Sequence, residues 1–238
     1  MSKQPYKRVL LKLSGEQLSG KFDSGIDSEF GAWLAAEIKK VANAGIQVVI
    51  MVGGGNYARG AQLAGHGIQR VTADNIGMLA TMMNGLALSD ICNAHELPAI
   101  VITNIKADQV ADQFTHRRAE SHLSKGRVVI IAGGIGRPYL TTDTAAVALA
   151  LELDCQVVLK ATKVDGVYNK DPSKYKDAVK VERISFQDAV SDEAIRVMDK
   201  AALGLALEHE LPIIVFNANQ ADNIYKAAHG DSTGTLIG

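Results

Sequence analysis

Four short clusters in this sequence combine glycine with lysine, asparagine, threonine or aspartate in ways that suit phosphate binding. They are residues 12–15 (KLSG), 53–56 (GGGN), 133–144 (GGIGRPYLTTDT) and 160–172 (KATKVDGVYNKDP). Glycine lets backbone N–H groups approach an anion closely, and a lysine ammonium adds a compact positive charge. Together the clusters indicate a site that neutralises the charge of a phosphorylated ligand.

The first two clusters differ in how strongly they indicate a phosphate. Lys12 ends an apolar run before Ser14 and Gly15. This pattern fits a phosphate-binding lysine and a solvated lysine beside a turn equally well. The three glycines 53–55 cost backbone entropy that a plain turn would avoid, and Arg59 follows closely enough to clamp phosphate oxygens. The segment has neither the Walker A pattern nor GxGxxG. Phosphate binding is favoured there over a tight turn.

The third cluster leads from one apolar segment into another that is rich in alanine. Thr141 or Thr142 can cap a helix there, and the N-terminus of that helix suits an anion. Asp143 beside an anion needs a compensating cation, such as Lys12 or bound Mg²⁺. Simple N-capping is the alternative, but the preceding glycines make it insufficient.

The fourth cluster reads as a hairpin. Asp165-Gly166 marks a turn between two short apolar pieces, and Asp171-Pro172 ends the segment. With Lys160 at a strand end and the aromatic Tyr168, this hairpin could wrap a nucleobase.

The elements that must position these clusters alternate along the chain. Strands are predicted at residues 8–13, 47–52, 99–102, 127–132, 156–160 and 213–216. Helices are predicted at about 30–41 (capped by Asp27 and ended by Gly45), 73–95, 115–125, 143–153, 185–190 and 197–210, with a short helix before the tail.

Strands that are apolar on both faces and alternate with helices predict the α/β class, as a mostly parallel open sheet. We expect one domain, 1–238, built as a three-layer α/β/α sandwich. Ligands bind at the carboxyl ends of such strands, and the glycine clusters fall there.

Composition narrows the class of protein. The 238 residues include 25 Lys and Arg against 26 Asp and Glu, a formal charge of −1. This balance argues against a nucleic-acid-binding surface. Two cysteines in apolar segments exclude a disulfide framework and fit a reducing cytoplasm. The apolar run near the start is too short for a signal peptide or a membrane span, so a soluble cytoplasmic protein is expected.

In this order, KLSG, GGGN, TTDTAA and LKATKVDGVY resemble the motifs of bacterial-type uridylate (UMP) kinases of the amino-acid-kinase fold. The resemblance runs from residue 7 to residue 236. It implies the reaction ATP + UMP → ADP + UDP by direct in-line transfer, a step of pyrimidine nucleotide synthesis. It also implies Mg²⁺ carried mainly by the ATP phosphates, a homohexamer, and feedback inhibition by UTP.

The same resemblance implies roles for individual residues. Lys12, Asp143 and Asp199 would be catalytic. The residues implied to bind ATP are Lys12, Leu13, Ser14, Gly15, Gly55, Arg59, Thr162, Tyr168 and Asp171. The residues implied to bind UMP are Gly54, Asp74, Ile135, Gly136, Arg137, Pro138, Tyr139, Leu140, Thr141 and Thr142. An acceptor-nucleotide lobe would span about 1–155 and an ATP-binding lobe about 156–238.

Several residues depart from the family pattern, whose acceptor loop usually reads GTGNPFFTTD. Here Ile135 replaces Thr, which removes one possible hydrogen bond to the pyrimidine. Arg137 replaces Asn and adds a charge, and Leu140 replaces Phe. Ser89 stands where many relatives have Arg, which predicts weak or no activation by GTP.

Two other functions fit the same sequence. One is a kinase of the same fold with a carboxylate or carbamate acceptor, which the nucleotide-type motifs disfavour. The other is a catalytically idle nucleotide sensor, which the presence of Lys12, Asp143 and Asp199 disfavours.

Overall fold

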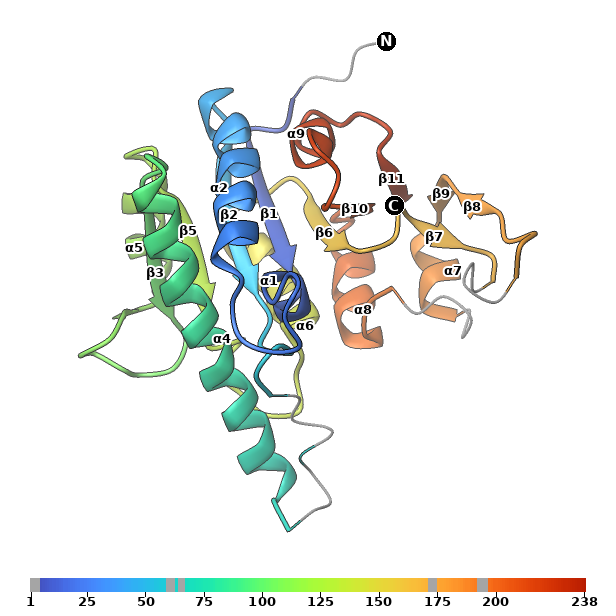
Figure 1. The fold of residues 1–238 in the computed structure, drawn as a ribbon. Helices are drawn as coiled ribbons and strands as arrows, with labels where there is room; N and C mark the ends of the chain where they lie inside the picture. The colour runs from blue at the N-terminus through green and yellow to red at the C-terminus, as the bar shows by residue number, and fades with distance from the viewer. Residues whose placement is uncertain (1–4, 59–62, 64–66, 171–174, 192–196) are drawn as a thin grey trace.

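The alternating apolar and amphipathic segments form one sheet between two layers of helices (Figure 1). The computed structural model describes residues 5–58, 63, 67–170, 175–191 and 197–238. The predicted α/β/α sandwich is confirmed.

The sheet has nine strands in the order β4-β3-β5-β2-β1-β6-β10-β11-β9. All neighbouring pairs are parallel except β10 and β11, which run antiparallel. The long inner strands are β1 (Arg8–Leu13), β2 (Gln47–Val52), β3 (Ala99–Thr103), β5 (Val128–Ala132), β6 (Val158–Thr162) and β10 (Ile213–Asn217). The outer strands are β4 (Asp112–Gln113), β9 (Arg183–Ile184) and β11 (Gly234–Ile237).

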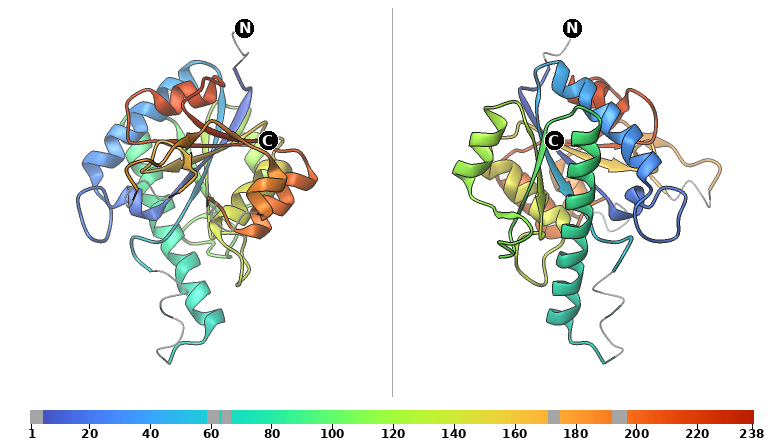
Figure 2. Two further views of the ribbon diagram at one scale, coloured as in Figure 1. Left: turned by 90° about the vertical axis from the view of Figure 1, so that its right-hand side faces the viewer. Right: turned by 60° about the vertical axis from the view of Figure 1, so that its left-hand side comes forward.

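Helices cover both faces of the sheet (Figure 2). One face carries α2 (Ser28–Asn43), α4 (Arg70–Ala94) and α9 (Asn223–Ala228). The other carries α5 (His116–Leu123), α6 (Thr142–Glu152), α7 (Phe186–Ser191) and α8 (Lys200–Glu208). The single turn α1 (Gly15–Leu18) follows β1 directly. The N-terminal half of α4 projects beyond the sheet in both figures.

The inner strands are apolar on both faces because successive side chains enter different cores. Val9 and Leu11 lie in the core beneath α2, whereas Leu10 lies in the core beneath α6. The parallel register also aligns the strand ends. Lys12 of β1 pairs with Met51 of β2 on one side and with Lys160 of β6 on the other. The fold therefore places two lysines side by side near the carboxyl-terminal ends of two neighbouring inner strands.

The predicted hairpin at 160–172 is wrong. β6 is bordered by β1 and β10, so it has no free edge to pair with the segment after Asp165-Gly166. Instead β7 (Val167–Tyr168) pairs antiparallel with β8 (Lys180–Val181), outside the main sheet. The segment predicted as a tail contains β11, because Gly234–Ile237 completes the edge of β10.

Several boundaries also move. β6 begins two residues later than predicted, and α4 begins at Arg70 rather than at residue 73. α8 begins at Lys200 because Asp199 is its N-cap and accepts a hydrogen bond from the Ala202 backbone N–H. The predicted cap of α2 is confirmed, since Asp27 accepts from the N–H groups of Glu29 and Phe30.

Among the residues that the structure describes, no helix combines the length and the apolar character that crossing a bilayer requires.

Candidate active site

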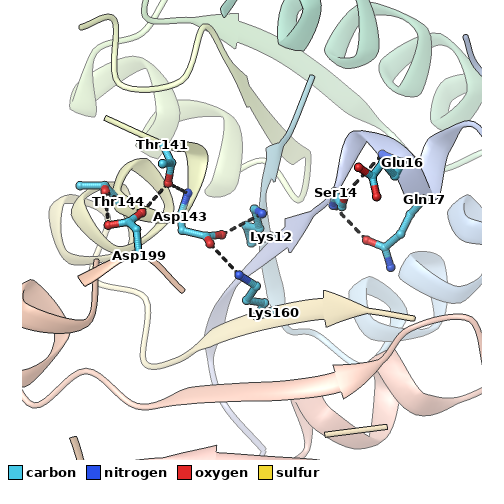
Figure 3. Close-up of polar contacts among 9 residues, drawn as sticks. All are labelled: Lys12, Ser14, Glu16, Gln17, Thr141, Asp143, Thr144, Lys160 and Asp199. Carbon is cyan, nitrogen blue, oxygen red and sulfur yellow. Dashed lines mark hydrogen bonds and ion pairs between the residues drawn. The ribbon is translucent and has the colours of Figure 1, made fainter. Parts of the chain in front are cut away.

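Two lysines share one carboxylate where β1, β6 and the start of α6 meet (Figure 3). The Lys12 Nζ atom lies 2.8 Å from Asp143 Oδ1, and the Lys160 Nζ atom lies 2.6 Å from Asp143 Oδ2. The three side chains are only 11%, 12% and 14% exposed for Lys12, Lys160 and Asp143. Lys160 donates a hydrogen bond to Oδ2, whereas Oδ1 is buried without a well-aligned hydrogen bond. The strand register creates this cluster, and α6 supplies its carboxylate.

The charges of this cluster do not cancel. Burial raises the pKa of the Asp143 carboxyl, but the positive charges of Lys12 and Lys160 outweigh burial and hold that pKa below its ordinary value. Burial lowers the pKa of Lys160, and Lys12 adds to this effect, whereas Asp143 opposes it. Two ammonium groups and one carboxylate leave an excess of positive charge when all are ionised. Such a site is suited to an anion.

The N-terminus of α6 adds to this anion site. Thr141 is its N-cap, and the Thr141 hydroxyl accepts a hydrogen bond from the Asp143 N–H at 3.0 Å. The predicted capping by this Thr-Thr-Asp segment is thus present together with the lysine cluster. The positive end of the helix dipole points the same way as the two ammonium groups.

Asp199 ties α6 to α8. Its carboxylate accepts hydrogen bonds from the Thr141 and Thr144 hydroxyls, the latter at 2.9 Å, and from the Ala202 N–H at 2.8 Å. These contacts hold the start of α6 in place, and the described contacts of Asp199 do not include Lys12. Asp199 therefore lies in the wall of the site rather than in the lysine cluster.

A cavity of about 460 Å³ opens in front of the cluster. It brings together residues from three of the sequence clusters and from α4. Its walls include Lys12, Ser14, Gly54, Asp74, Thr81, Leu140, Thr141, Thr142, Asp143 and Asp199.

The glycine loop after β2 forms one wall through a close backbone approach. A Cβ atom on Gly54 would lie 2.7 Å from the Gly77 carbonyl oxygen of α4 and 2.8 Å from the Ala80 Cβ. The Gly53 N–H donates to the Leu13 carbonyl at 2.8 Å, which joins this loop to the end of β1. Glycine at 54 is therefore required for the loop to lie against α4.

The acceptor loop, residues 134–140, is fastened to α4 by Asp74. The Asp74 Oδ2 atom accepts from the Tyr139 N–H at 2.8 Å, and Arg70 Nε lies 2.9 Å from both Asp74 oxygens. The Arg70 guanidinium also lies 5.3 Å from the centroid of the Tyr139 ring. Tyr139 adopts a left-handed φ of 68°, which is uncommon for a residue with a side chain. Asp74 lies in the second turn of α4, not in the first, because the helix begins at Arg70.

A second cavity, of about 590 Å³, lies along the same loop. Ile135, Gly136 and Arg137 line it together with Asn75, Met78 and Asn104, among others. The Asn104 Nδ2 atom donates to the Gly134 carbonyl at 2.6 Å. The structure thus divides the predicted UMP residues between two cavities that share Met78, with Pro138 and Tyr139 between them in the sequence.

The predicted ATP residues form two groups. Ser14 caps α1, in a reciprocal arrangement in which the Ser14 N–H donates to Gln17 Oε1 at 2.9 Å. Thr162 donates its hydroxyl to the Val164 and Phe216 carbonyls, and the Tyr168 hydroxyl donates to Asp165 at 2.6 Å. These internal contacts shape the loop after β6.

Other predicted ATP residues lie elsewhere. Leu13 is buried at the end of β1, Gly15 is buried at the start of α1, and Gly55 belongs to the glycine loop after β2. Arg59 and Asp171 lie outside the described residues.

The sequence pattern placed Lys160 at a strand end and suggested, with Tyr168, a part in wrapping a nucleobase, but it did not predict the pairing of Lys160 with Asp143. The available signal was the repeated pattern of an apolar strand ending in lysine, at Lys12 and Lys160. Arg70 and Thr81 were also missed, because they carry no local signal for a binding site, whereas Thr144 lies in the third cluster without a role predicted for it.

A magnesium ion would find few protein ligands here. The described residues contain no group of three or more His, Cys, Asp or Glu side chains arranged to hold a metal. Asp143 is balanced by two lysines, and Asp199 already accepts several hydrogen bonds. With both carboxylates engaged in this way, the described residues fit an ion held mainly by ligand phosphates.

Comparison with known proteins adds to this geometry. Residues 7–217 match the model of the amino acid kinase family. The chain is 43% identical over 240 residues to a uridylate kinase of Dichelobacter nodosus, covering 100% of this chain and 99% of that protein.

Solved structures agree. A UMP kinase from Bacillus anthracis superposes with a TM-score of 0.93 at 39% identity, covering 98% of this chain and 96% of that one. A UMP kinase from Ureaplasma parvum gives a TM-score of 0.90 at 34% identity, with coverages of 100% and 99%.

Proposed function

The chain belongs to the amino acid kinase family, and we propose that it transfers the γ-phosphoryl group of ATP to UMP, giving ADP and UDP for pyrimidine nucleotide synthesis. It is a phosphotransferase. Full-length similarity to uridylate kinases supports UMP as the acceptor. The observation that carries the mechanism is the Lys12–Asp143–Lys160 cluster, in which two ammonium groups share one carboxylate beside a cavity that Lys12 lines.

The reaction needs positioning and charge neutralisation more than covalent catalysis. The acceptor is a phosphate that is already ionised at neutral pH, so no side chain must remove a proton. Lys12 is the group that stabilises charge on the transferring phosphoryl oxygens. Asp143 bridges Lys12 and Lys160 and fixes the positions of both ammonium groups. The N-terminus of α6 adds the positive end of its helix dipole to the site.

Mg²⁺ would supply further neutralisation of the ATP phosphates. Within the chain, Asp143 and Asp199 are the carboxylates of the cavity wall that would hold such an ion.

The assignment of residues to the two substrates is part of this proposal. ATP would lie along Lys12, Leu13, Ser14, Gly15, Gly55, Arg59, Thr162, Tyr168 and Asp171, with the ATP lobe at about 156–238. UMP would lie along Gly54, Asp74 and residues 135–142, in the lobe at about 1–155. The homohexamer, the cytoplasmic location and feedback inhibition by UTP belong to the same proposal.

An assay of ADP release tests the acceptor. Purified protein with Mg²⁺ and ATP is offered UMP, CMP, dUMP, aspartate, glutamate or carbamate in turn. We expect the highest kcat/KM with UMP. Equal or better turnover with CMP or an amino acid would contradict the proposal, and turnover with carbamate would favour the other branch of the family.

A further inference from the structure

Two buried polar side chains on α4 touch both loops of the candidate site. Thr81 is 2% exposed and Asn84 is 0% exposed. Their spacing puts them on one face of the helix, the face that also bears Asp74 seven residues before Thr81. Both are neutral, and neither type of side chain supplies the charge that phosphoryl transfer needs. Their burial beside the site therefore calls for another explanation.

Asn84 fixes the glycine loop after β2. Its Nδ2 group donates to the Gly53 carbonyl at 2.6 Å and to Asn56 Oδ1 at 2.7 Å. Asn56 returns the contact, donating from Nδ2 to Asn84 Oδ1 at 2.9 Å. Two buried amides thus satisfy each other, and one of them also holds the backbone at the first glycine of the loop.

The same pair reaches the segment after Lys12. Asn56 also donates to the Gly25 carbonyl at 2.6 Å. A Cβ atom on Gly15 would lie 2.5 Å from Asn56 Oδ1 and 2.6 Å from the Gly55 nitrogen. Because these backbones are in close contact, the position of Asn56 also fixes the turn that follows the lysine strand.

Thr81 fixes the acceptor loop. Its hydroxyl donates to the Met78 carbonyl at 2.7 Å and accepts from the Gly133 N–H at 2.7 Å. Gly133 has a φ of 79°, and a Cβ atom there would lie 2.9 Å from Thr103 Oγ1. The loop therefore leaves β5 through a glycine conformation that Thr81 holds against α4.

We propose that Thr81 and Asn84 are positioning residues for the phosphoryl transfer described above, on which this inference rests. Through them α4 carries the acceptor loop and the glycine loop as one unit and sets the distance between them. Productive transfer depends on such distances, since a misplacement of about 1 Å can cost on the order of 10²-fold in rate.

Substitution of Thr81 separates positioning from plain stability. Thr81→Val removes the hydroxyl and keeps the shape, so the Gly133 N–H loses its acceptor. We expect the KM for UMP to rise about threefold to tenfold, as the loss of one neutral hydrogen bond predicts, with the KM for ATP within about twofold. Thr81→Ser keeps the hydroxyl and is expected to restore the native KM.

Thr235→Val is the matched control. Thr235 is 0% exposed, and its hydroxyl also bridges two backbone groups, accepting from the Val167 N–H and donating to the Val181 carbonyl. It lies far from the acceptor loop in the sequence, among β7, β8 and β11. We expect a lower Tm in this variant without a rise in the KM for UMP.

The amide pair is tested by the double variant Asn56→Leu/Asn84→Leu. Replacing both partners with apolar groups of similar shape avoids leaving one buried amide unpaired, so the protein can fold. We expect a lower kcat/KM together with faster hydrogen exchange at residues 53–58. In Thr81→Val, faster exchange is expected at residues 133–140 instead.

Hydrogen exchange keeps the two proposals distinguishable. Wild-type protein without UMP-dependent ADP release would overturn the proposed function, while exchange in the variants would still show whether α4 holds the loops. Unchanged exchange at both loops, or a Thr81→Val variant that loses Tm as Thr235→Val does with an unchanged KM for UMP, would overturn the positioning role.

Discussion

Lys12 and Lys160 occupy paired positions on neighbouring strands and both contact Asp143, yet Lys12 lines the cavity and Lys160 is not among its lining residues. Lys160 donates a hydrogen bond to Asp143, and its burial beside Lys12 lowers its pKa. Lys12 lines the cavity and has an ion pair with Asp143 that lacks hydrogen-bond alignment. At the scale of the residue, Lys12 is therefore the cation available to the transferring group, and Lys160 is the one that orients the carboxylate.

Lys12→Ala should reduce kcat far more than it weakens ATP binding. Loss of a charge aimed at the reacting group costs on the order of 10²–10³-fold, by analogy with the removal of an oxyanion donor. Steady-state rates at varied ATP measure kcat and KM separately. Lys21→Ala, at an exposed lysine paired with Glu29, is the control. A kcat within about threefold of the native value would make Lys12 a structural lysine only.

Asp143→Asn tests which effect sets the pKa of this carboxyl. The neutral amide leaves two buried ammonium groups without their counter-charge, so the variant should be less stable at pH 7.5 by about 3–5 kcal/mol. Since the folded-state pKa of Asp143 lies below 3.8, its stabilisation is present above the unfolded pKa and is lost as pH falls through the folded value.

The difference in unfolding free energy between wild type and Asp143→Asn should therefore not shrink from pH 7.5 to about pH 5, because loss of the carboxylate can only lower the pKa of Lys160 further. Urea unfolding at several pH values measures it. If burial outweighed the lysines, the pKa would be raised and the difference would already shrink in that range.

At the scale of the element, strand periodicity and helix caps carry most of the information in the sequence. Apolar runs predicted the inner strands, and Asp27 and Thr141 marked helix starts correctly. The hairpin after Lys160 was wrong because pairing depends on which strand edges are free, and both edges of β6 are occupied by elements distant in sequence. The role of Lys160 depends on the same non-local register.

The polar residues Thr81 and Asn84 of α4 could not be predicted from the local sequence. Thr81 and Asn84 lie in a helix that mixes polar and apolar residues throughout, and their partners are backbone atoms of loops about 50 and 30 residues away. No local pattern distinguishes them from ordinary helix residues. The sequence pointed to Lys12, Asp143 and Asp199 as candidate site residues, but it gave no indication of Thr81 and Asn84, the α4 residues that contact the two loops.

Asp74 joins one of these loops to α4, and its substitution should act on the acceptor. In the proposed role the carboxylate accepts a hydrogen bond from a ribose hydroxyl, because an ionised carboxylate can only accept. Such a bond to a charged group is worth about 1.5–3 kcal/mol, so Asp74→Ala should raise the KM for UMP roughly ten- to 150-fold and leave the KM for ATP nearly unchanged.

The ratio of kcat/KM for UMP and dUMP distinguishes two causes of that effect. A contact to the 2′-hydroxyl predicts that Asp74→Ala discriminates less between these nucleotides. Arg70→Gln is the control, since it removes the ion pair at 2.9 Å and keeps the carboxylate. A lower Tm of Asp74→Ala with native UMP kinetics would show that Asp74 only stabilises the loop through its hydrogen bond with the Tyr139 N–H.

At the scale of the whole molecule, the sheet joins the proposed acceptor and ATP lobes without a linker. β1 pairs with β2 on one side and with β6 on the other, so both lobes contact the strand that carries Lys12. A continuous sheet offers no hinge between the lobes among the described residues. We therefore expect regulation to act through ligands at the site or at surfaces of single elements.

GTP should activate this protein weakly or not at all. An effector shifts an equilibrium only through contacts that differ between two states, and a guanine nucleotide triphosphate needs cationic contacts for its phosphates. Ser89 stands on α4 where many relatives carry Arg, and it is only 6% exposed, so this position offers neither charge nor access. Initial rates at limiting ATP, with and without GTP, should agree within about twofold.

UTP in the same assay is the positive control for nucleotide response, because it shares the uridine of the acceptor and should inhibit. Stimulation of several-fold by GTP would show that a residue other than Ser89 supplies the activating contact.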